Sequence, residues 1–136
     1  MNNEEQTLSI IKPDAVERNL QDSIKNDFES RGFEIIKEKK IHISKNEAEQ
    51  FYKVHETKPF YGELCNYLSS GPIIVMILQK ENAVKENRSL MGATDPKKAE
   101  ENTLRKKYGI SIDKNSVHGS DSIENAKIEI DFFFKD

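Results

Sequence analysis

The sequence predicts an α+β fold of the ferredoxin-like kind, a four-stranded antiparallel sheet with helices on one face. Four short segments have the apolar alternation or continuous apolar character of strands, and the segments between them have the period of helices. Their order is β-α-β-β-α-β, with an inserted helix pair and a long loop before the last strand. We expect residues 1–136 to form a single domain, because one compact core typically spans roughly 100 to 150 residues.

The first part of the chain predicts a strand, a helix and a second strand. An apolar strand covers residues 8–11 and stops before Pro13, because proline has no amide hydrogen to donate to a neighbouring strand. One apolar residue in every four predicts a helix around residues 20–28, which Gly32 ends with a left-handed cap. Alternating apolar positions at both ends of residues 33–43 predict the longer second strand.

The middle of the chain predicts the added helix pair and a buried strand. Ser44 and Glu47 have the spacing of a capping box at a helix N-terminus. The apolar positions of that helix are Ala48, Phe51 and Val54. A second helix is expected over residues 61–69. Residues 72–79 form the most apolar segment and predict a strand in the centre of the sheet.

The last part predicts a helix, a loop, a short strand and a closing helix. The helix covers residues 82–90, and residues 93–115 show too little apolar periodicity to predict anything but a long loop. A short strand is expected near Val117. Asp121 and Glu124 resemble a capping pair for the closing helix. The expected apolar face of that helix consists of Ile123, Ala126, Ile130 and Phe133.

Composition and charge exclude several kinds of protein. The chain has 24 acidic and 21 basic residues, a net charge of −3 and no long basic block, which argues against dedicated nucleic-acid binding. Cys65 is the single cysteine, so an internal disulfide and a metal site of several thiolates are excluded. The N-terminus lacks a signal-peptide pattern, and no apolar run approaches the roughly 20 residues of a membrane-spanning helix. We therefore expect a cytoplasmic protein without a membrane partner.

His118 stands out among the three histidines. His42 alternates with isoleucines on a strand and His55 lies at a helix end, so both are interpreted as structural, and the three positions do not predict a zinc site. His118 lies among small and hydroxyl residues just before a predicted helix N-terminus, an environment that favours anions. From these residues alone, a catalytic histidine and an ordinary turn are equally good interpretations.

An anion site needs further donors, and several lie at turns after apolar elements. Lys12, Arg88 and Arg105 are the cations, and Thr94 and Ser120 have hydroxyls that can donate to phosphate. Taken singly, each cation is better interpreted as a solvated surface residue. Neither of the common glycine-rich phosphate-binding motifs is present, so a bound nucleotide would have to be held in another way.

Six short motifs together resemble the nucleoside diphosphate kinase family. The resemblance runs from about Gln6 to Phe134, and its most specific part is the His-Gly-Ser-Asp-Ser run of residues 118–122. The six motifs are Ile11-Lys12-Pro13-Asp14, Lys58-Pro59-Phe60, Ser70-Gly71-Pro72, Leu90-Met91-Gly92-Ala93-Thr94 with Asp95-Pro96, Thr103-Leu104-Arg105 and Asn115-Ser116-Val117-His118-Gly119-Ser120-Asp121-Ser122. Members of that family add a helix pair and a long loop to a ferredoxin-like fold.

The resemblance implies a ping-pong kinase that moves the γ-phosphoryl group of a nucleoside triphosphate to a nucleoside diphosphate through a phosphohistidine. His118 matches the nucleophile, and an imidazole of ordinary pKa is mostly neutral at pH 7 and able to attack phosphorus. Glu129 matches the acid that hydrogen-bonds this histidine and sets its tautomer. Tyr52 and Ser120 match residues close to the nucleophile.

The same resemblance implies how the nucleotide is held. The residues that match phosphate-binding positions are Lys12, Arg88, Thr94 and Arg105. Asn115, again with Lys12, matches the contact to the ribose hydroxyls. Phe60 and Ile112 match the pair that sandwiches the base, with Leu64 beside them, and stacking of this kind implies broad base specificity. Mg²⁺ is the implied cofactor, held mainly by nucleotide phosphates and not by protein side chains.

The oligomeric state and two other functions stay open. The resemblance implies a homo-oligomer, but the residues at 101–102 and 106–107 depart from the usual ones in the loop that builds subunit contacts, so both a tetramer and a hexamer are compatible. A non-catalytic nucleotide-binding or regulatory relative would have lost the nucleophile or a phosphate-site cation, and all are present here. An RNA-binding ferredoxin-like module would need exposed aromatic residues on a basic sheet, whereas the expected central strands carry Ile and Leu.

Overall fold

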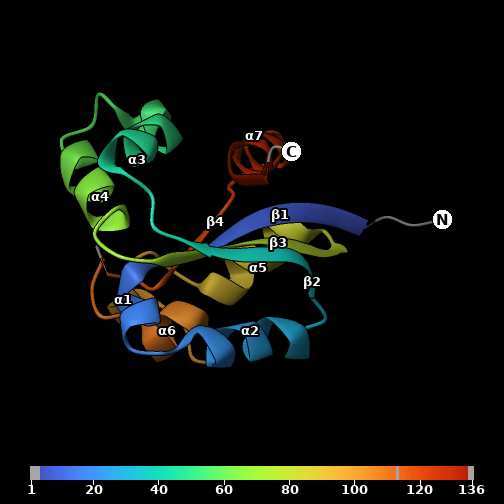
Figure 1. Cartoon of the computed structure of the whole chain (residues 1–136). Helices are drawn as coiled ribbons and strands as arrows, with labels where there is room; N and C mark the ends of the chain where they lie inside the picture. Colours follow the sequence, from blue (N-terminus) through green and yellow to red (C-terminus); the bar gives the residue numbers. More distant parts are fainter. Residues whose placement is uncertain (1–3, 113, 135–136) are drawn as a thin grey trace.

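The computed structural model describes residues 4–112 and 114–134, apart from the side chain of Val54. These residues form one antiparallel sheet flanked by helices (Figure 1). The strands are β1 (Glu4–Ile11), β2 (Glu34–Ile41), β3 (Ile73–Glu81) and β4 (Val117–Gly119). The helices are α1 (Pro13–Glu17), α2 (Gln21–Ser30), α3 (Lys45–Phe51), α4 (Tyr61–Leu68), α5 (Ala83–Met91), α6 (Leu104–Tyr108) and α7 (Ile123–Phe134), with short 3₁₀ turns at Lys53–His55 and Pro96–Lys98.

The strand order confirms the predicted ferredoxin-like α+β fold. The sheet has the order β2-β3-β1-β4, and each strand is antiparallel to its neighbours. The two central strands pair over all of β1 and over Ile74–Glu81 of β3. β4 pairs with the other edge of β1, where His118 lies opposite Ile10. The pairing places the segment around His118 on a strand that the centre of the sheet supports.

Helices cover both faces of the sheet, which corrects the prediction that they lie on one face. Successive side chains of a strand point to opposite faces, so Ile74 and Met76 of β3 pack in one apolar cluster and Ile73 and Val75 pack in another. The first cluster is completed by residues of α1, α2, α5 and α6, and the second by residues of α3, α4 and α7 (Figure 1). A strand buried on both sides needs apolar side chains at every position, which explains why this segment is continuously apolar.

Local sequence explains where several elements begin and end. The capping box predicted at Ser44 is present, because the Ser44 hydroxyl accepts from the amide of Glu47 at 3.1 Å and the Glu47 carboxylate accepts from the amide of Ser44 at 2.9 Å. Gly32 follows α2 with a φ of +87°, as expected for a left-handed position. The helices predicted over residues 61–69 and 82–90 are confirmed as α4 and α5. The strand predicted near Val117 is confirmed as β4.

The region predicted as one long loop, residues 93–115, contains structure that apolar periodicity does not reveal. Asp95 accepts a hydrogen bond from the amide of Lys97 and begins a 3₁₀ turn. Thr103 caps the five-residue helix α6 by accepting from the amide of Lys106. Both elements are too short to show a period, so side-chain caps are the stronger signal. The short helix α1 is missed for a similar reason, since proline also begins helices.

The ends of two predicted helices differ from the structure. α7 is capped by Ser122 and not by Asp121, because the Ser122 hydroxyl accepts from the amide of Asn125 at 3.1 Å. Ile123, expected on the apolar face of α7, is exposed. α3 ends at Phe51, so Val54 does not belong to it, and the side chain of Val54 lies outside the described part of the chain.

Candidate active site

His118 is held between the centre of the sheet and the last helix. It lies on β4, and its side chain is 20% exposed. Its Nε2 atom lies 3.1 Å from Oε1 of Glu129 in α7. The next residue is Gly119, and a Cβ there would lie 2.2 Å from Nδ2 of Asn87 in α5, so that side chain would have to shift. The absence of a side chain at this position allows α5 to pack directly against β4 and brings α5 close to His118.

Ser120 holds the carboxylate of Glu129 in place. Its buried hydroxyl donates to the same Oε1 atom at 2.8 Å and accepts from the amide of Leu8 in β1 at 3.3 Å. The carboxylate is therefore oriented by the sheet through a second residue. An ionised carboxylate only accepts hydrogen bonds, so the nitrogen facing it, Nε2 of His118, carries the proton and Nδ1 keeps the lone pair.

Aromatic residues of α3 and the turn after it form a wall beside His118. The ring centroids of Phe51 and Tyr52 lie 5.3 Å and 6.5 Å from that of His118. Burial, with a smaller contribution from the negative charge of Glu129, raises the pKa of Tyr52 well above its ordinary value, so its phenol stays a neutral hydrogen-bond donor. A small cavity of about 70 Å³ separates this wall from β4 and α7. Its lining includes Phe51, Tyr52, His55, His118, Asp121 and Glu129.

His55 lines the same small cavity, although its position at a helix end predicts a structural role. Its Nδ1 atom is buried and has no hydrogen-bond partner among the described residues. The ring lies between Tyr52 and Phe60, with centroid distances of 6.3 Å and 6.1 Å. The one signal in the sequence is its spacing of three residues from Tyr52, which brings both side chains to the same side of a helical turn.

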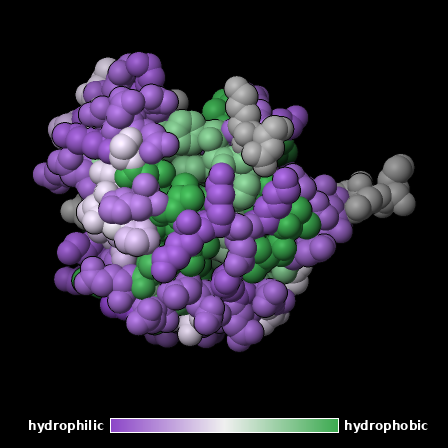
Figure 2. All heavy atoms as spheres, in the orientation of Figure 1, coloured by the Kyte–Doolittle hydropathy of each residue, from purple (hydrophilic) through white to green (hydrophobic). Residues whose placement is uncertain are grey.

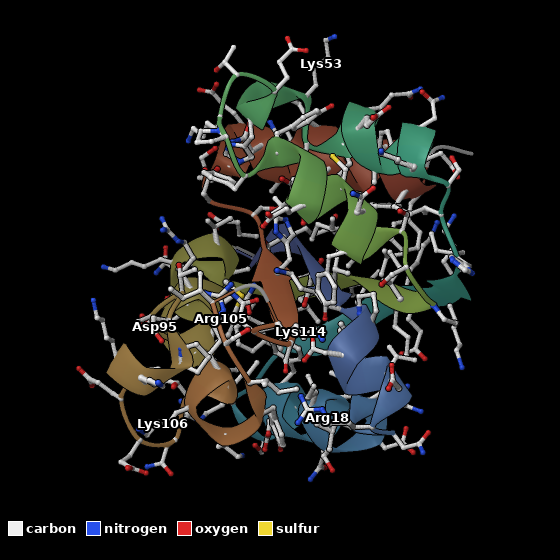
Figure 3. The ribbon with its side chains drawn as sticks, turned by 90° about the vertical axis from the view of Figure 1, so that its left-hand side faces the viewer. Arg18, Lys53, Asp95, Arg105, Lys106 and Lys114 are labelled. Atoms are coloured by element: carbon white, nitrogen blue, oxygen red, sulfur yellow. The ribbon has the colours of Figure 1, made fainter. Side chains whose placement is uncertain are left out.

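Arg105, which is labelled in Figure 3, is a half-buried cation without an acidic partner among the described residues. One nitrogen of its guanidinium donates to the carbonyl of Gly92 at 3.1 Å, and another donates to the carbonyl of Val117 at 3.0 Å. No carboxylate of the described residues forms an ion pair with it, and its Nε atom has no partner among them. Burial and then the nearby charge of Arg88 lower the pKa of Arg105 to about 10. An anion bound here would supply the missing counter-charge.

A larger cavity of about 640 Å³ collects the remaining phosphate-site candidates. Arg88, Thr94 and Arg105 line it, together with Lys85 and Asp121. Asp121 also lines the small cavity, so the two cavities meet on either side of this residue. The cations line the larger cavity, and the imidazole of His118 lines the smaller one. Binding of an anionic group and nucleophilic attack on it would use the two cavities together.

Lys12 and Asn115 are buried together next to this region. The ammonium of Lys12 donates to Oδ1 of Asn115 at 2.9 Å, and Nδ2 of Asn115 donates to the carbonyl of Thr94 at 3.2 Å. Both side chains are almost fully buried. The structure thus connects three of the residues that the resemblance assigned to nucleotide binding, although they come from three separate segments of the chain.

Phe60, Leu64 and Ile112, the residues matched to the base, are more open. Phe60 is 43% exposed and Ile112 is 55% exposed, whereas Leu64 is half-buried in α4. The Lys58 ammonium lies 5.7 Å from the centroid of the Phe60 ring. None of the three matched residues lines either of the two cavities.

The described residues contain neither a metal-binding cluster nor a membrane-spanning helix. No three His, Cys, Asp or Glu side chains within residues 4–112 and 114–134 come together in a way that could bind a metal ion. No helix in that part of the chain has the length and apolar character needed to cross a membrane. The site combines an oriented imidazole, a half-buried arginine without an acidic partner among the described residues and an adjacent cavity, which suits transfer of an anionic group to nitrogen.

Comparison with known protein families decides which proteins share this arrangement. The family model described as nucleoside diphosphate kinase matches residues 5–136. The chain belongs to the nucleoside diphosphate kinase family. The nucleoside diphosphate kinase of Wolinella succinogenes is 56% identical over 130 residues, which is 96% of this chain and 95% of that protein. The enzyme of Rhizorhabdus wittichii is 55% identical over 131 residues, which is 96% of this chain and 94% of its own length.

A solved structure of the family has the same fold. The crystal structure of the Aquifex aeolicus nucleoside diphosphate kinase matches with a TM-score of 0.94 at 39% identity, and the match covers 96% of this chain and 95% of that one. The helix pair α3–α4 and the segment between α5 and β4 therefore belong to the shared fold of the nucleoside diphosphate kinase family. The resemblance identified from the six sequence motifs is confirmed.

Proposed function

We propose that this protein is a nucleoside diphosphate kinase that works through a phosphohistidine on His118. The observation that carries the proposal is the contact of Nε2 with Glu129, which leaves the lone pair on Nδ1. Nδ1 attacks the γ-phosphorus of a nucleoside triphosphate, the bond from that phosphorus to the bridging oxygen breaks, and the nucleoside diphosphate leaves. The β-phosphate oxygen of a second diphosphate then attacks the phosphohistidine, and the phosphorus–nitrogen bond breaks.

Glu129 and Ser120 orient the nucleophile in this mechanism. As Nδ1 bonds to phosphorus the ring gains positive charge, and the Glu129 carboxylate at 3.1 Å stabilises that charge. Ser120 keeps the carboxylate aimed at the ring, at 2.8 Å from Oε1. Tyr52 supports the imidazole from the aromatic wall, and its raised pKa keeps it uncharged beside the phosphoryl group.

The transferred phosphates bind to the cations of the larger cavity. Arg105 and Arg88 neutralise the phosphate oxygens, and the hydroxyl of Thr94 donates a hydrogen bond to them. Lys12, between β1 and α1, supplies a further positive charge. Mg²⁺ is the proposed cofactor, bound mainly to phosphate oxygens, and it would neutralise charge on the phosphates during transfer. The residues fit such an ion, because the Asp121 carboxylate lines both cavities and can accept hydrogen bonds from metal-bound water.

The nucleoside binds on the open side of the site. Its base stacks between Phe60 and Ile112, with Leu64 beside it, and its ribose hydroxyls meet Lys12 and Asn115. Apolar walls give no hydrogen bonds to the edges of a base, so purine and pyrimidine nucleotides are accepted alike.

The decisive experiment is to trap the intermediate. Incubation with γ-labelled ATP and Mg²⁺ should label the protein through a bond that is labile in acid and stable in base, and added GDP should remove the label as GTP. Well-folded protein that takes up no label, or label that GDP does not discharge, would contradict the ping-pong mechanism.

We further infer that the chain is a single domain, works in the cytoplasm and assembles into a homo-oligomer, a tetramer or a hexamer. Exposed apolar residues outside the proposed site support the assembly, among them Ile36 on the edge strand β2 and Ile128 on α7. The face in Figure 2 likewise shows apolar areas between hydrophilic side chains. Light scattering coupled to gel filtration would distinguish the two oligomers, and a monomer would contradict the inference.

A further inference from the structure

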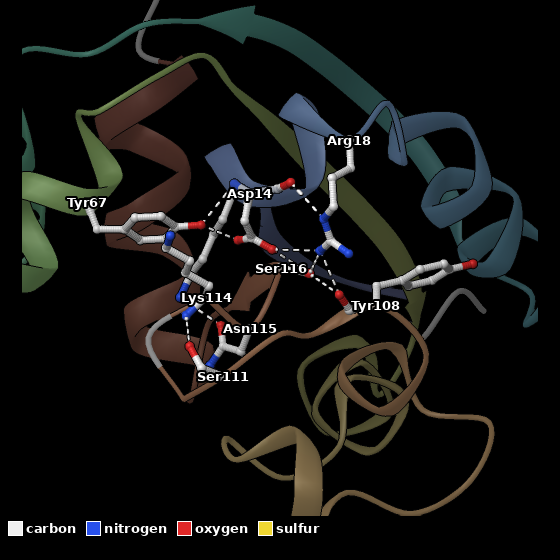
Figure 4. A network of polar contacts seen from close by, with 9 residues as sticks. Asp14, Arg18, Tyr67, Tyr108, Ser111, Lys114, Asn115 and Ser116 are labelled. Carbon is white, nitrogen blue, oxygen red and sulfur yellow. Dashed lines mark hydrogen bonds and ion pairs between the residues drawn. The ribbon is translucent and has the colours of Figure 1, made fainter.

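A buried carboxylate that the proposed reaction does not use lies beneath the nucleoside side of the site. Asp14 is only 7% exposed and belongs to α1, two residues after Lys12. Figure 4 shows that its oxygens accept hydrogen bonds from three different places in the chain. Tyr67 of α4 donates to Oδ1, while Arg18 of α1 and Ser116 donate to Oδ2 at 3.0 Å and 2.8 Å. The tyrosine contact is reciprocal, because the amide of Asp14 donates to the Tyr67 hydroxyl at 2.8 Å.

Each segment that meets Asp14 carries a part of the proposed nucleoside site. α4 contains Leu64 and begins directly after Phe60. α1 begins directly after Lys12. Ser116 directly follows Asn115 and ends the loop of Ile112. One carboxylate therefore joins the two apolar walls for the base to the polar residues for the ribose.

Ser116 needs this support because its backbone is strained. It is fully buried and has a φ of +75°, a left-handed conformation that residues other than glycine adopt only when their surroundings hold them there. Asp14 and Arg18 hold its hydroxyl, and its carbonyl accepts from the amide of Lys12 at 2.8 Å. Arg18 also donates to the carbonyl of Tyr108 at 2.6 Å. Tyr108 and Ser116, which lie on either side of Ile112 and Asn115 in the sequence, are thus both fastened to α1 or to the residue before it.

We propose that Asp14 is a positioning residue that sets the spacing of the nucleoside-binding residues by fastening α4 and Ser116, next to Asn115, to α1. The inference rests on the proposed function, since that function assigns the nucleoside to these segments. Asp14 itself touches no substrate. Of the phosphate-binding residues, Arg88 and Arg105 come from α5 and α6, and Lys12 stays attached to α1. Loosening α4 from Asp14 should therefore weaken nucleoside binding and leave phosphate binding unchanged.

Two tyrosine-to-phenylalanine variants separate this role from a general loss of stability. Tyr67→Phe keeps the ring and removes the hydroxyl that binds Asp14. Tyr108→Phe is the matched control, because its hydroxyl binds Asp27 at 2.7 Å and its link to the Asp14 network runs through the backbone carbonyl, which stays. Calorimetry with ADP plus Mg²⁺ and with inorganic pyrophosphate plus Mg²⁺ measures the nucleotide and the phosphate contributions separately, and steady-state assays give KM and kcat.

Tyr67→Phe should raise the Kd for ADP and the KM for nucleoside diphosphates about tenfold, the effect of losing one hydrogen bond to a charged group. The Kd for pyrophosphate should not change, and kcat should change less than KM. Tyr108→Phe should leave both dissociation constants at their wild-type values. Ser116→Gly, which removes the hydroxyl and relieves the left-handed strain, should reproduce the selective loss of ADP binding in a protein that folds normally.

Equal losses of ADP and pyrophosphate binding in Tyr67→Phe would overturn the proposal, and so would equal effects of the two tyrosine variants or no effect of either. Failure of the proposed function looks different, because the wild-type protein would then neither bind ADP nor form the labelled intermediate. Without a nucleoside site, the proposed positioning role of Asp14 would be wrong as well.

Discussion

His118 and Phe60 belong to the same proposed site but lie in very different surroundings. The side chains of His118 and Glu129 are 20% and 17% exposed, and hydrogen bonds that run through Ser120 to β1 hold them. Phe60 and Ile112 are 43% and 55% exposed and offer only apolar faces. The histidine side is hydrogen-bonded to the central strand β1, whereas the base side is carried by the helix pair on one face of the sheet and by the segment before β4.

The difference follows from what each side has to do. A nucleophile needs its reacting atom within a few tenths of an ångström of the correct position, which requires a support that does not move. A base held by stacking needs a flat apolar surface, and every base can use it. The reacting groups are therefore mostly buried and held by hydrogen bonds, whereas the residues that stack on the base are exposed.

The largest effect is expected at the nucleophile. His118→Ala should abolish the phosphoenzyme and reduce turnover to background, because no other described side chain of the small cavity combines a nucleophilic nitrogen with an orienting carboxylate. The measurement is labelling with γ-labelled ATP, with the circular dichroism spectrum as the control for folding. Labelling of the folded variant would mean that another residue, such as His55, accepts the phosphoryl group.

The next largest effect is expected at the residue that orients the nucleophile. Glu129→Gln keeps the shape of the side chain but removes its charge, so kcat should fall by about 10² while KM stays nearly constant. Glu124→Gln is the matched control on the same helix, since Glu124 is exposed. Comparable kcat values for the two variants would show that the carboxylate beside His118 has no role in the reaction.

A smaller effect, on KM and not on kcat, is expected at the residues that stack on the base. Phe60→Ala removes one stacking surface, so KM should rise about tenfold for every nucleoside diphosphate while kcat changes little. Glu29→Ala, at an exposed position of α2, serves as the control. A loss confined to one base would contradict broad specificity, and a fall in kcat alone would place Phe60 on the catalytic side.

The smallest effect concerns stability at high pH. The pKa of Tyr52 is raised, so above about pH 10 the unfolded chain releases a proton that the folded protein keeps, and the free energy of unfolding falls as pH rises. This contribution is fully present below pH 10. Tyr52→Phe should make the fall less steep by up to about 1.4 kcal/mol per pH unit, measured by urea unfolding between pH 9 and pH 11. An unchanged slope would show that Tyr52 ionises in the folded state.

Sequence patterns were most reliable where a residue's own neighbours decide its structure. The capping box of Ser44 and the continuous apolar run of β3 were predicted correctly, because a side-chain cap and a buried strand are both properties of a few consecutive residues. Short capped helices such as α6 were missed, because five residues show no period. The sequence does not predict that helices cover the second face of the sheet, although it predicts the helix pair and the apolar face of α3.

The six motifs, above all the segment around His118 together with Met91-Gly92-Ala93-Thr94, predict the family, since the identity and order of residues in chemically constrained segments are visible in the sequence. The tertiary structure decides which atoms of the site come into contact. The proton-bearing nitrogen of His118 depends on Glu129 eleven residues later, and the shape of the nucleoside side depends on Asp14, which contacts residues more than fifty and one hundred positions away. Hydrogen bonds act over about 3 Å, so only the fold can decide which distant groups come within that range.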